Sequence, residues 1–285
     1  MAAGRCSRYA GLVPQPPSNW NDKRALVTGG SAGLGLAIAD ALASRGAAVR
    51  IAGRDAGKLD EAAAWLRRHG GMVETTAVDL AEQGAGGRLS AEAAPLDLLC
   101  HAAGRSMRGR VVDTTAEEFE ALWRINFLAA AELARGSAAG LAERRGSLVL
   151  IGSLATHSAP RNLGAYPTSK FPLAALAQQL RLEMGEGAAP GGGLHTLLVC
   201  PGPIARPDGG ARYDDQASGL DAAARKPGAG AKVSAIDPDR LAEKILNACE
   251  RRQSELVLPK KARLLFALSR LSPDWGDWLL RKMSG

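Results

Sequence analysis

The segment Thr28-Gly29-Gly30-Ser31-Ala32-Gly33-Leu34-Gly35 decides how this chain folds. It follows a short apolar run at 24–27 and opens an apolar stretch of helical period at about 34–44. A glycine-rich turn between a strand and a helix lets the backbone approach a phosphate group, whose charge the helix N-terminus favours. An ordinary tight turn is the simpler alternative. We predict from the context that this turn binds the pyrophosphate of a dinucleotide.

The rest of the chain continues the same alternation of short apolar runs and longer helical stretches. We expect strands at 48–52, 72–78, 96–101, 147–151, 194–200 and 255–258, and helices at 58–68, 115–141, 165–184 and 238–249. Asp237 is the expected cap of the last helix, and Pro238 its first position. This alternation predicts an α/β protein with a single Rossmann-type domain, a doubly wound parallel sheet of about seven strands with helices on both faces. The expected boundaries are a flexible leader at 1–22, the domain at 23–258 with a substrate loop at 205–235, and a C-terminal tail at 259–285.

Composition narrows the class of protein. Of the 285 residues, 46% are hydrophobic, which is enough for a substantial core.

The cysteines, the apolar runs and the charge bear on the compartment and the partners. The four cysteines have neither CxxC nor CxxH spacing, so we expect no metal site and no disulfide framework. Cysteines without a disulfide framework suggest a cytoplasmic location. No apolar run reaches the roughly 20 residues that span a bilayer. The net charge of +7 lies largely after Glu250, without a nucleic-acid-binding motif, so we expect no nucleic-acid partner.

Three residues in the middle of the chain suggest proton chemistry. Tyr166 and Lys170 are four positions apart and share a helix face, so the lysine can favour ionisation of the phenol. Ser153 follows an apolar run and can donate a hydrogen bond. Each residue alone is commonplace, and only their order and their elements carry the inference.

The residues after the second expected strand bear on the choice of dinucleotide. An enzyme that selects NAD usually offers a carboxylate about here to the adenosine 2′-hydroxyl, whereas this chain has Gly53 followed by Arg54. Arg54, with Lys58 one turn later, can bind a 2′-phosphate. The alternative is that both are solvated surface charges and that Lys58 merely flanks Asp55. We expect NADP(H) to be favoured over NAD(H).

With these motifs the chain resembles the short-chain dehydrogenase/reductase family from about 23 to 258. The glycine turn is similar to the family's TGxxxGxG, and 201–204 to its segment beside the nicotinamide. The resemblance implies a catalytic tetrad of Asn126, Ser153, Tyr166 and Lys170. Taken with the residues above, the expected cofactor contacts are Gly29, Ser31, Ala32, Gly33, Leu34, Gly35, Arg54, Lys58, Asp79, Leu80, Ala103, Tyr166, Lys170, Pro201, Gly202 and Ile204.

The resemblance also implies a reaction, hydride transfer between NADP(H) and a carbonyl or secondary alcohol. Tyr166 would exchange the proton, Lys170 would lower the phenol's pKa and bind the nicotinamide ribose, Ser153 would bind the carbonyl oxygen, and Asn126 would hold a water that resupplies protons. An NAD-dependent alcohol dehydrogenase, and a cofactor-bound sensor or scaffold without turnover, are the alternatives. Members of the family usually form homodimers or homotetramers, and the resemblance implies the same here.

Two features depart from the family pattern. His101-Ala102-Ala103-Gly104 stands where the family has Asn-Asn-Ala-Gly, so other hydrogen bonds must hold this turn. We interpret His101 as a packed, hydrogen-bonded residue in preference to a ligand or base. Pro172 lies inside an expected helix, where it removes a hydrogen bond and should bend the helix just beyond Lys170.

The tail at 261–283 has a basic amphipathic pattern. Leu264, Phe266, Leu271, Trp275 and Trp278 recur at helical spacing with flanking Lys and Arg, and Pro273 divides two short helices. Such a tail can lie peripherally on a membrane, or can cover the protein's own pocket or a subunit contact. Either role suggests an apolar substrate, and the layout is similar to that of 3-ketodihydrosphingosine reductases.

Overall fold

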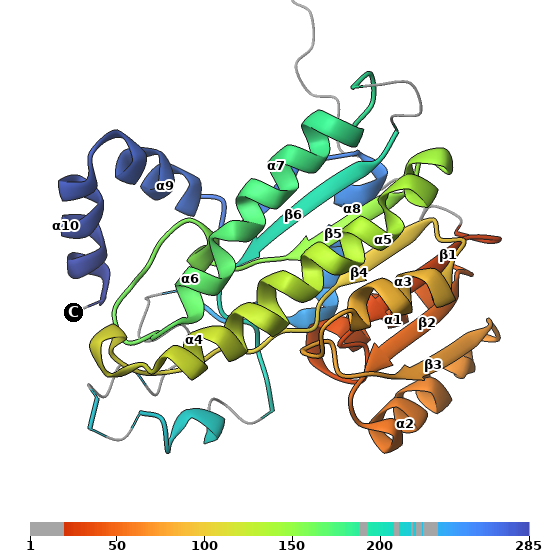
Figure 1. Cartoon of the computed structure of the whole chain (residues 1–285), viewed down its shortest axis with the longest axis horizontal. Helices are drawn as coiled ribbons and strands as arrows, with labels where there is room; N and C mark the ends of the chain where they lie inside the picture. Colours follow the sequence, from red (N-terminus) through yellow and green to blue (C-terminus); the bar gives the residue numbers. More distant parts are fainter. Residues whose placement is uncertain are drawn as a thin grey trace, which may run out of the picture.

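Seven parallel strands form one sheet in the computed structural model, in the order β3-β2-β1-β4-β5-β6-β7 (Figure 1). The structure describes residues 20–188, 193–207, 211–217, 219, 220, 224 and 233–284. The predicted doubly wound α/β fold with a single Rossmann-type domain is confirmed. The strands are β1 (Arg24–Thr28), β2 (Ala48–Gly53), β3 (Val73–Ala77), β4 (Leu98–His101), β5 (Ser147–Ile151), β6 (His195–Pro201) and β7 (Glu255–Leu258).

Helices cover both faces of the sheet. On one face α1, α2 and α8 share a core with the strands, and on the other face α3, α5 and α7 do so (Figure 1). The α-helices are α1 (Gly33–Ala43), α2 (Ala56–Leu66), α3 (Ala85–Ala93), α4 (Ala116–Trp123), α5 (Ala129–Glu143), α6 (Tyr166–Lys170), α7 (Pro172–Met184), α8 (Pro238–Glu250), α9 (Ala262–Leu271) and α10 (Pro273–Ser284). Short helical turns are η1 (Arg67–His69), η2 (Val111–Asp113), η3 (Arg124–Leu128), η4 (Leu154–Thr156) and η5 (Ala211–Tyr213).

The sheet has a switch point between β1 and β4, where the order of strands reverses. Thr28, the last residue of β1, pairs with Ala52 on one side and with His101 on the other. The connections leave in opposite directions from the carboxyl ends of these strands, which opens a crevice where such folds bind their ligands. All the sequence-predicted site residues lie on segments that follow, or lie next to, this carboxyl edge.

Two predicted long helices are interrupted where function was expected. The stretch predicted at 115–141 contains α4 and α5, but η3 between them is a π-helix that includes Asn126. Single π turns inside α-helices are frequent at functional sites. The stretch at 165–184 divides at Phe171, because Pro172 has no N–H to donate and begins α7.

The elements after β6 also follow their sequence signals. Asp237 caps α8 by accepting a hydrogen bond from the Arg240 N–H at 2.9 Å, and Pro238 takes the first helical position. β7 is the edge strand, and Pro273 begins α10 as expected. The helix α3 was not predicted, because its Ala- and Gly-rich sequence has little periodicity. Residues 1–19 of the expected leader and about half of the expected substrate loop at 205–235 lie outside the described residues.

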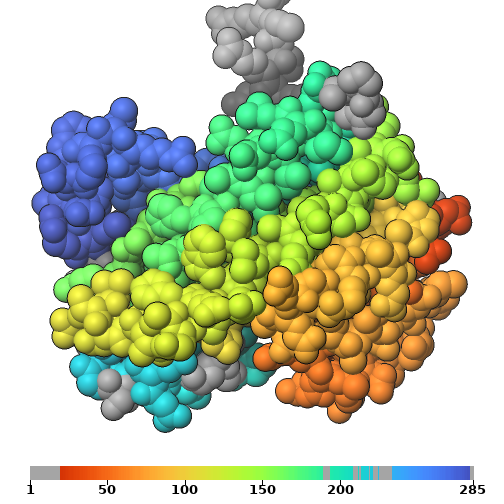
Figure 2. All heavy atoms as spheres, viewed as in Figure 1, coloured from red at the N-terminus to blue at the C-terminus, as the bar shows by residue number. Residues whose placement is uncertain are grey.

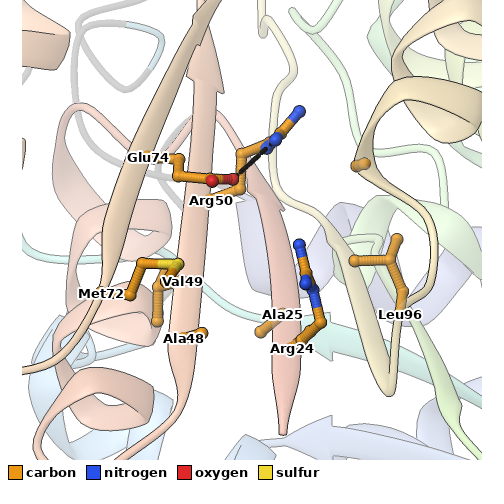
Figure 3. A pocket seen from close by; sticks show the side chains of 9 residues that line it. Arg24, Ala25, Ala48, Val49, Arg50, Met72, Glu74 and Leu96 are labelled. Carbon is orange, nitrogen blue, oxygen red and sulfur yellow. Dashed lines mark hydrogen bonds and ion pairs between the residues drawn. The ribbon is translucent and has the colours of Figure 1, made fainter.

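A shallow hollow lies at the amino ends of β1, β2 and β3, opposite the edge that carries the predicted site. Figure 3 shows its lining, where Arg50 extends across to Glu74 with 2.6 Å between Nη2 and Oε2. The ion pair links neighbouring strands and the hollow includes none of the expected site residues. Among the helices that the structure describes, none combines the length and the apolar character needed to cross a membrane.

Candidate active site

The glycine turn after β1 is shaped by backbone contacts that exclude side chains. Gly29 has φ +68°, and a Cβ there would lie 2.8 Å from the backbone N of Ala103. A Cβ on Gly35 would collide with the carbonyl group of Gly29, 2.6 Å from its carbon. Gly33 has φ +54° and open space where its Cβ would be. The turn therefore packs tightly against β4 and α1 but leaves room on its outer side.

The N-terminus of α1 faces this room without a side-chain cap. Ala32 at the N-cap offers no hydrogen bond, and the first turn has no acidic residue. The first backbone N–H groups of a helix have no partner within the helix, and they attract an anion. A pyrophosphate thus fits the turn, with Gly33 giving the close approach. Ser31 and Leu34, also expected contacts, belong to the same turn and its helix.

The end of β2 lies beside the glycine turn, as a dinucleotide site requires. A Cβ on Gly53 would be 3.6 Å from Ser31 Oγ. Arg54 is exposed, and within the described part of the chain it makes no ion pair. Lys58 Nζ lies 3.7 Å from Asp55 Oδ2, and both side chains are exposed. Arg54 is therefore the available cation here, while Lys58 is already paired.

The other expected cofactor contacts lie at the ends of β3 and β6. Asp79 accepts a hydrogen bond from the Ala81 N–H at 2.9 Å, and Leu80 is buried. Gly202 donates its N–H to the Leu258 carbonyl at 2.8 Å, and Ile204 forms a bridge with Ile236. Pro201 ends β6. These contacts fix the backbone on either side of the crevice.

Asn126 is fully buried in η3 and uses its amide to hold two neighbouring segments. Its Oδ1 accepts from the Arg105 N–H at 2.9 Å, and its Nδ2 donates to the Arg105 carbonyl at 2.8 Å and to Ser169 Oγ at 2.9 Å. A Cβ on Gly104 would lie 2.7 Å from this Oδ1 and 3.4 Å from Lys170 Nζ. Asn126 thus ties the segment after β4 to α6 and lies beside Lys170.

Ser153 and Tyr166 meet at the carboxyl end of β5. Ser153 Oγ accepts from the Ala155 N–H at 3.1 Å, which leaves its hydroxyl hydrogen available to donate. Burial raises the pKa of Tyr166, and the hydrogen bond with Ser153 acts in the opposite direction. The expected net lowering of this pKa was wrong for this structure, because burial of the phenol is the largest influence and outweighs the lowering by Ser153, Arg108 and Arg206.

Lys170 is buried with its ammonium group beside the backbone of β5. Nζ donates to the Ile151 carbonyl at 2.9 Å. Burial lowers the pKa of Lys170 to about 8. A lysine with this pKa can release and take up a proton near neutral pH. The four expected tetrad residues are therefore together at one end of the crevice.

Sequence reasoning missed a cationic group beside Tyr166. Arg108 is buried, its guanidinium lies 3.8 Å from the ring centre of Tyr213, and its Nε donates to the Ala224 carbonyl at 2.7 Å. Its backbone N–H donates to Gln216 Oε1 at 2.9 Å. Arg108 therefore holds the described residues Tyr213, Gln216 and Ala224 of the expected substrate loop. No motif identifies Arg108, because these partners lie more than a hundred positions away.

His101 is the packed, hydrogen-bonded residue that the sequence indicated. Its side chain is fully buried, and Nδ1 lies 3.0 Å from Thr28 Oγ1. The same Thr28 hydroxyl accepts from the Ala103 N–H at 3.2 Å, so Thr28 links His101 to the turn that follows β4. Burial lowers the pKa of His101 to about 3, and Lys170 acts in the same direction. The ring is therefore neutral near physiological pH.

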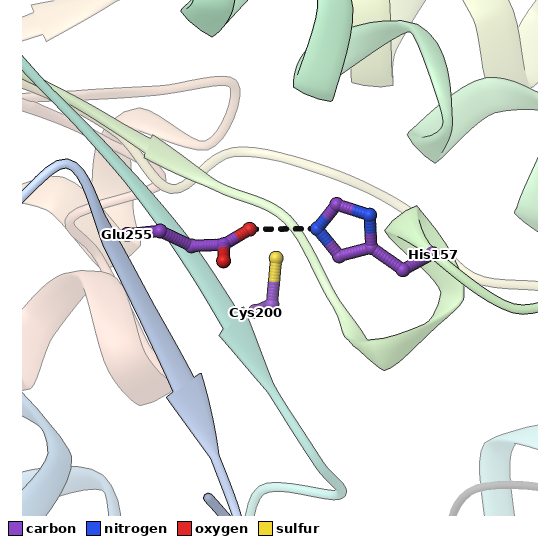
Figure 4. A group of neighbouring side chains, drawn as sticks. All are labelled: His157, Cys200 and Glu255. Atoms are coloured by element: carbon purple, nitrogen blue, oxygen red, sulfur yellow. Dashed lines mark hydrogen bonds and ion pairs between the residues drawn. The ribbon is translucent and has the colours of Figure 1, made fainter. Parts of the chain in front are cut away.

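A cluster of three titratable side chains lies between the tetrad and the C-terminal tail. The side chains of His157, Cys200 and Glu255 converge, with their ligand-type atoms all within 4.8 Å of one another (Figure 4). His157 Nε2 lies 2.7 Å from Glu255 Oε1, and Arg270 Nη2 lies 3.4 Å from Nδ1 of the same ring. Burial raises the pKa of Cys200 to about 12, so it is a thiol. We interpret the group as a hydrogen-bonded link between η4, β7 and α9.

Known proteins with sequence similarity extend this picture. EphD of Mycobacterium tuberculosis, described as a probable oxidoreductase, is 29% identical over 273 residues, which are 92% of this chain and 45% of EphD. The 3-ketodihydrosphingosine reductase of Bos taurus is 30% identical over 183 residues, 61% of this chain and 55% of that protein. The chain thus spans only about half the length of these relatives.

Solved structures agree with the fold. A short-chain dehydrogenase from Sphingobium yanoikuyae in complex with NADPH is 26% identical, has a TM-score of 0.71, and covers 90% of this chain and 94% of its own. The family model described as short chain dehydrogenase matches residues 23–216, from β1 through η5. Those residues include the glycine turn and all four members of the tetrad. The chain belongs to the short-chain dehydrogenase family of oxidoreductases.

Proposed function

We propose that the protein reduces a ketone, or oxidises the corresponding secondary alcohol, with NADP(H) as its cofactor. One observation carries the proposal: Ser153, Tyr166 and Lys170 converge at the same edge of the sheet as an uncapped helix N-terminus and a glycine turn. A sensor or scaffold without turnover would need only the uncapped helix N-terminus and the glycine turn, which bind the cofactor. The proposed location is the cytoplasm, and the proposed assembly is a homodimer or homotetramer, as is usual in the family.

The preference for NADP(H) rests on the end of β2. Gly53 offers no carboxylate to a 2′-hydroxyl, and the exposed Arg54 is available for a 2′-phosphate. Ser31 Oγ, adjacent to Gly53, adds a neutral donor on the same side. Lys58, held by Asp55, contributes less. An NAD-dependent enzyme in which Arg54 stacks on adenine is the competing proposal.

The chain's own residues would handle the proton and the oxygen. When bound, NADPH supplies the hydride. Tyr166 gives its proton to the carbonyl oxygen, and the Ser153 hydroxyl donates a hydrogen bond to the same oxygen. Arg108 and Arg206 favour the phenolate that remains, since both lower the pKa of Tyr166. Lys170 has a pKa of about 8, so we propose that it supplies the proton that returns to Tyr166 after each turnover.

The proposed substrate is an apolar, lipid-like ketone. Tyr166 packs against a small apolar cluster of Met107, Leu122, Ala165 and Phe119, so one side of the phenol is apolar. A relative named 3-ketodihydrosphingosine reductase supports a keto substrate for this type of chain. An apolar pocket excludes water, which strengthens the hydrogen bonds to the developing oxyanion.

The test is a panel of methyl ketones graded by chain length, assayed for oxidation of NADPH and of NADH. We expect kcat/KM to rise with chain length and to be higher with NADPH. Equal rates with both cofactors would support the NAD-dependent alternative. NADPH binding without oxidation by any ketone would support the sensor. A water-soluble diketone serves as a control for the effect of chain length.

A further inference from the structure

The helices α9 and α10 form a hairpin that leaves large apolar side chains in solvent. The exposed fractions are 66% for Leu264, 77% for Leu271, 60% for Trp275 and 56% for Trp278. Leu264 and Leu271 are seven positions apart on one face of α9, and Trp275 and Trp278 are neighbours on one face of α10. Figures 1 and 2 show the hairpin projecting from the body as a separate lobe.

The opposite face of α9 holds the hairpin in place. Phe266 is buried and lies 5.0 Å from His157 between ring centres. Arg263 donates to the Glu255 carbonyl at 2.9 Å, and Arg270 contacts His157. α10 then packs on α9 where Gly276 meets Ser269, so closely that a Cβ would lie 2.7 Å from Ser269 Oγ. These contacts fix the hairpin to the body and leave Leu264, Leu271, Trp275 and Trp278 exposed.

The charge of the hairpin indicates which kind of surface the exposed apolar side chains contact. The segment 259–284 carries six cations and two carboxylates, Asp274 and Asp277. Lys282 Nζ lies 5.2 Å from the ring centre of Trp278. Lys260, Lys261 and Arg281 make no ion pair within the described residues. Tryptophan and leucine flanked by lysine and arginine suit the boundary between anionic headgroups and acyl chains. A second copy of the hairpin would instead bring two sets of cations together.

We infer that the α9–α10 hairpin docks on the surface of an anionic phospholipid bilayer. Leu264, Leu271, Trp275 and Trp278 enter the headgroup boundary. The cations without an ion pair among the described residues, Lys260, Lys261 and Arg281, bind lipid phosphates and carboxylates. The link through His157 keeps the docked hairpin next to η4, which begins immediately after Ser153. This inference stands on the hairpin alone and does not depend on the proposed reaction.

The test is flotation of the full chain with two kinds of vesicle, pure phosphatidylcholine and equal parts of phosphatidylcholine and phosphatidylserine. We expect binding to the vesicles with phosphatidylserine, and loss of that binding at high salt because screening weakens the headgroup contacts. Trp278→Ser should weaken binding roughly tenfold, since an apolar ring leaves the boundary. Lys260→Gln with Lys261→Gln should weaken it about fivefold for each lysine.

Matched controls separate docking from general surface effects. Trp65 on α2 is also 56% exposed, and its ring also contacts a cation, because the guanidinium carbon of Arg68 lies 3.7 Å from the ring centre. Trp65→Ser, and Arg240→Gln with Lys244→Gln on α8, should bind vesicles like the wild type. The inference fails if the wild type binds neither vesicle at low salt, or if the Trp65 and Trp278 variants lose binding equally. It also fails if the Trp278 variant only dissociates an oligomer, as measured by light scattering.

Discussion

The glycine turn and the tetrad region lie at the same edge of the sheet, yet they are built in opposite ways. The turn is made largely of glycines, which have no side chain, so the backbone groups of Gly29, Gly33 and Gly35 can approach a ligand. The tetrad region is filled with buried polar groups, of which Asn126 and Lys170 already have protein partners. The comparison teaches that function is lost by adding atoms in the first region and by removing atoms in the second.

Removing one oxygen in the tetrad region should have the largest effect. Tyr166→Phe keeps the ring in its apolar cluster but eliminates the proton donor, so we expect kcat to fall by about 100- to 10,000-fold. NADPH binding, measured by fluorescence titration, should change little. Tyr213→Phe is the control, because the ring still stacks on Arg108, and it should cost less than tenfold. Turnover near the wild-type value in the Tyr166 variant would refute its assignment.

Adding one methyl group to the glycine turn should damage both stability and cofactor binding. In Gly35→Ala the new Cβ collides with the carbonyl group of Gly29, so we expect a loss of about 3 kcal/mol in the free energy of unfolding. Gly140→Ala in α5 meets no atom within 4 Å and should stabilise by about 0.5 to 1 kcal/mol. Urea denaturation of both variants provides the measurement. Equal effects at the two sites would contradict the described packing of the turn.

A cation at the rim of the turn should decide which cofactor is used. Arg54→Ala removes charge-assisted hydrogen bonds to a 2′-phosphate, so KM for NADPH should rise roughly 10- to 100-fold while KM for NADH stays the same. Lys58→Ala should have a small effect, since that side chain is exposed and paired with Asp55. Steady-state kinetics of both variants with both cofactors separates the two cations. A parallel change in both KM values would indicate that Arg54 binds the shared adenosine.

His101, which contacts Thr28 before the glycine turn and lies near Lys170 of the tetrad, should make the free energy of unfolding depend on pH. Burial lowers the pKa of His101 to about 3, below the ordinary value near 6.5, so the unfolded chain takes up a proton that the folded chain excludes. The stabilisation is complete above pH 6.5 and declines by up to about 1.4 kcal/mol per pH unit as the pH falls towards 3. In His101→Asn this decline should be smaller, because burial also lowers the pKa of His195 and its share of the decline remains. Urea midpoints between pH 7 and 5 that run parallel in the two proteins would contradict the burial of a neutral ring.

Local signals in the sequence predicted most of the fold and the four residues of the expected tetrad, whose catalytic roles stay a prediction. The turn at Gly29–Gly35, the cap at Asp237 and the break at Pro172 depend on neighbouring residues, so a single stretch of sequence reveals each of them. The π turn around Asn126 could not be predicted in this way, because the residues that stabilise it, Arg105 and Ser169, come from other parts of the chain.

Long-range contacts also explain what sequence reasoning missed about the site. Arg108 reaches Tyr213 and Ala224 only after the chain folds, and the link from His157 to Glu255 and Arg270 spans three elements. The pKa of Tyr166 was expected to be lowered by the neighbouring Lys170. Burial, which depends on the whole fold, raises it instead. Proximity in sequence therefore predicted which residues meet but not the balance of forces between them.

A crystal structure of the protein with NADPH would show whether the glycine turn and the tetrad region bind one cofactor. We expect the pyrophosphate to lie on the first turn of α1 beside Gly33, and the Tyr166 hydroxyl to face the nicotinamide with Ser153 and Lys170 on either side. A nucleotide bound elsewhere, or a phenol directed away from the nicotinamide, would contradict it.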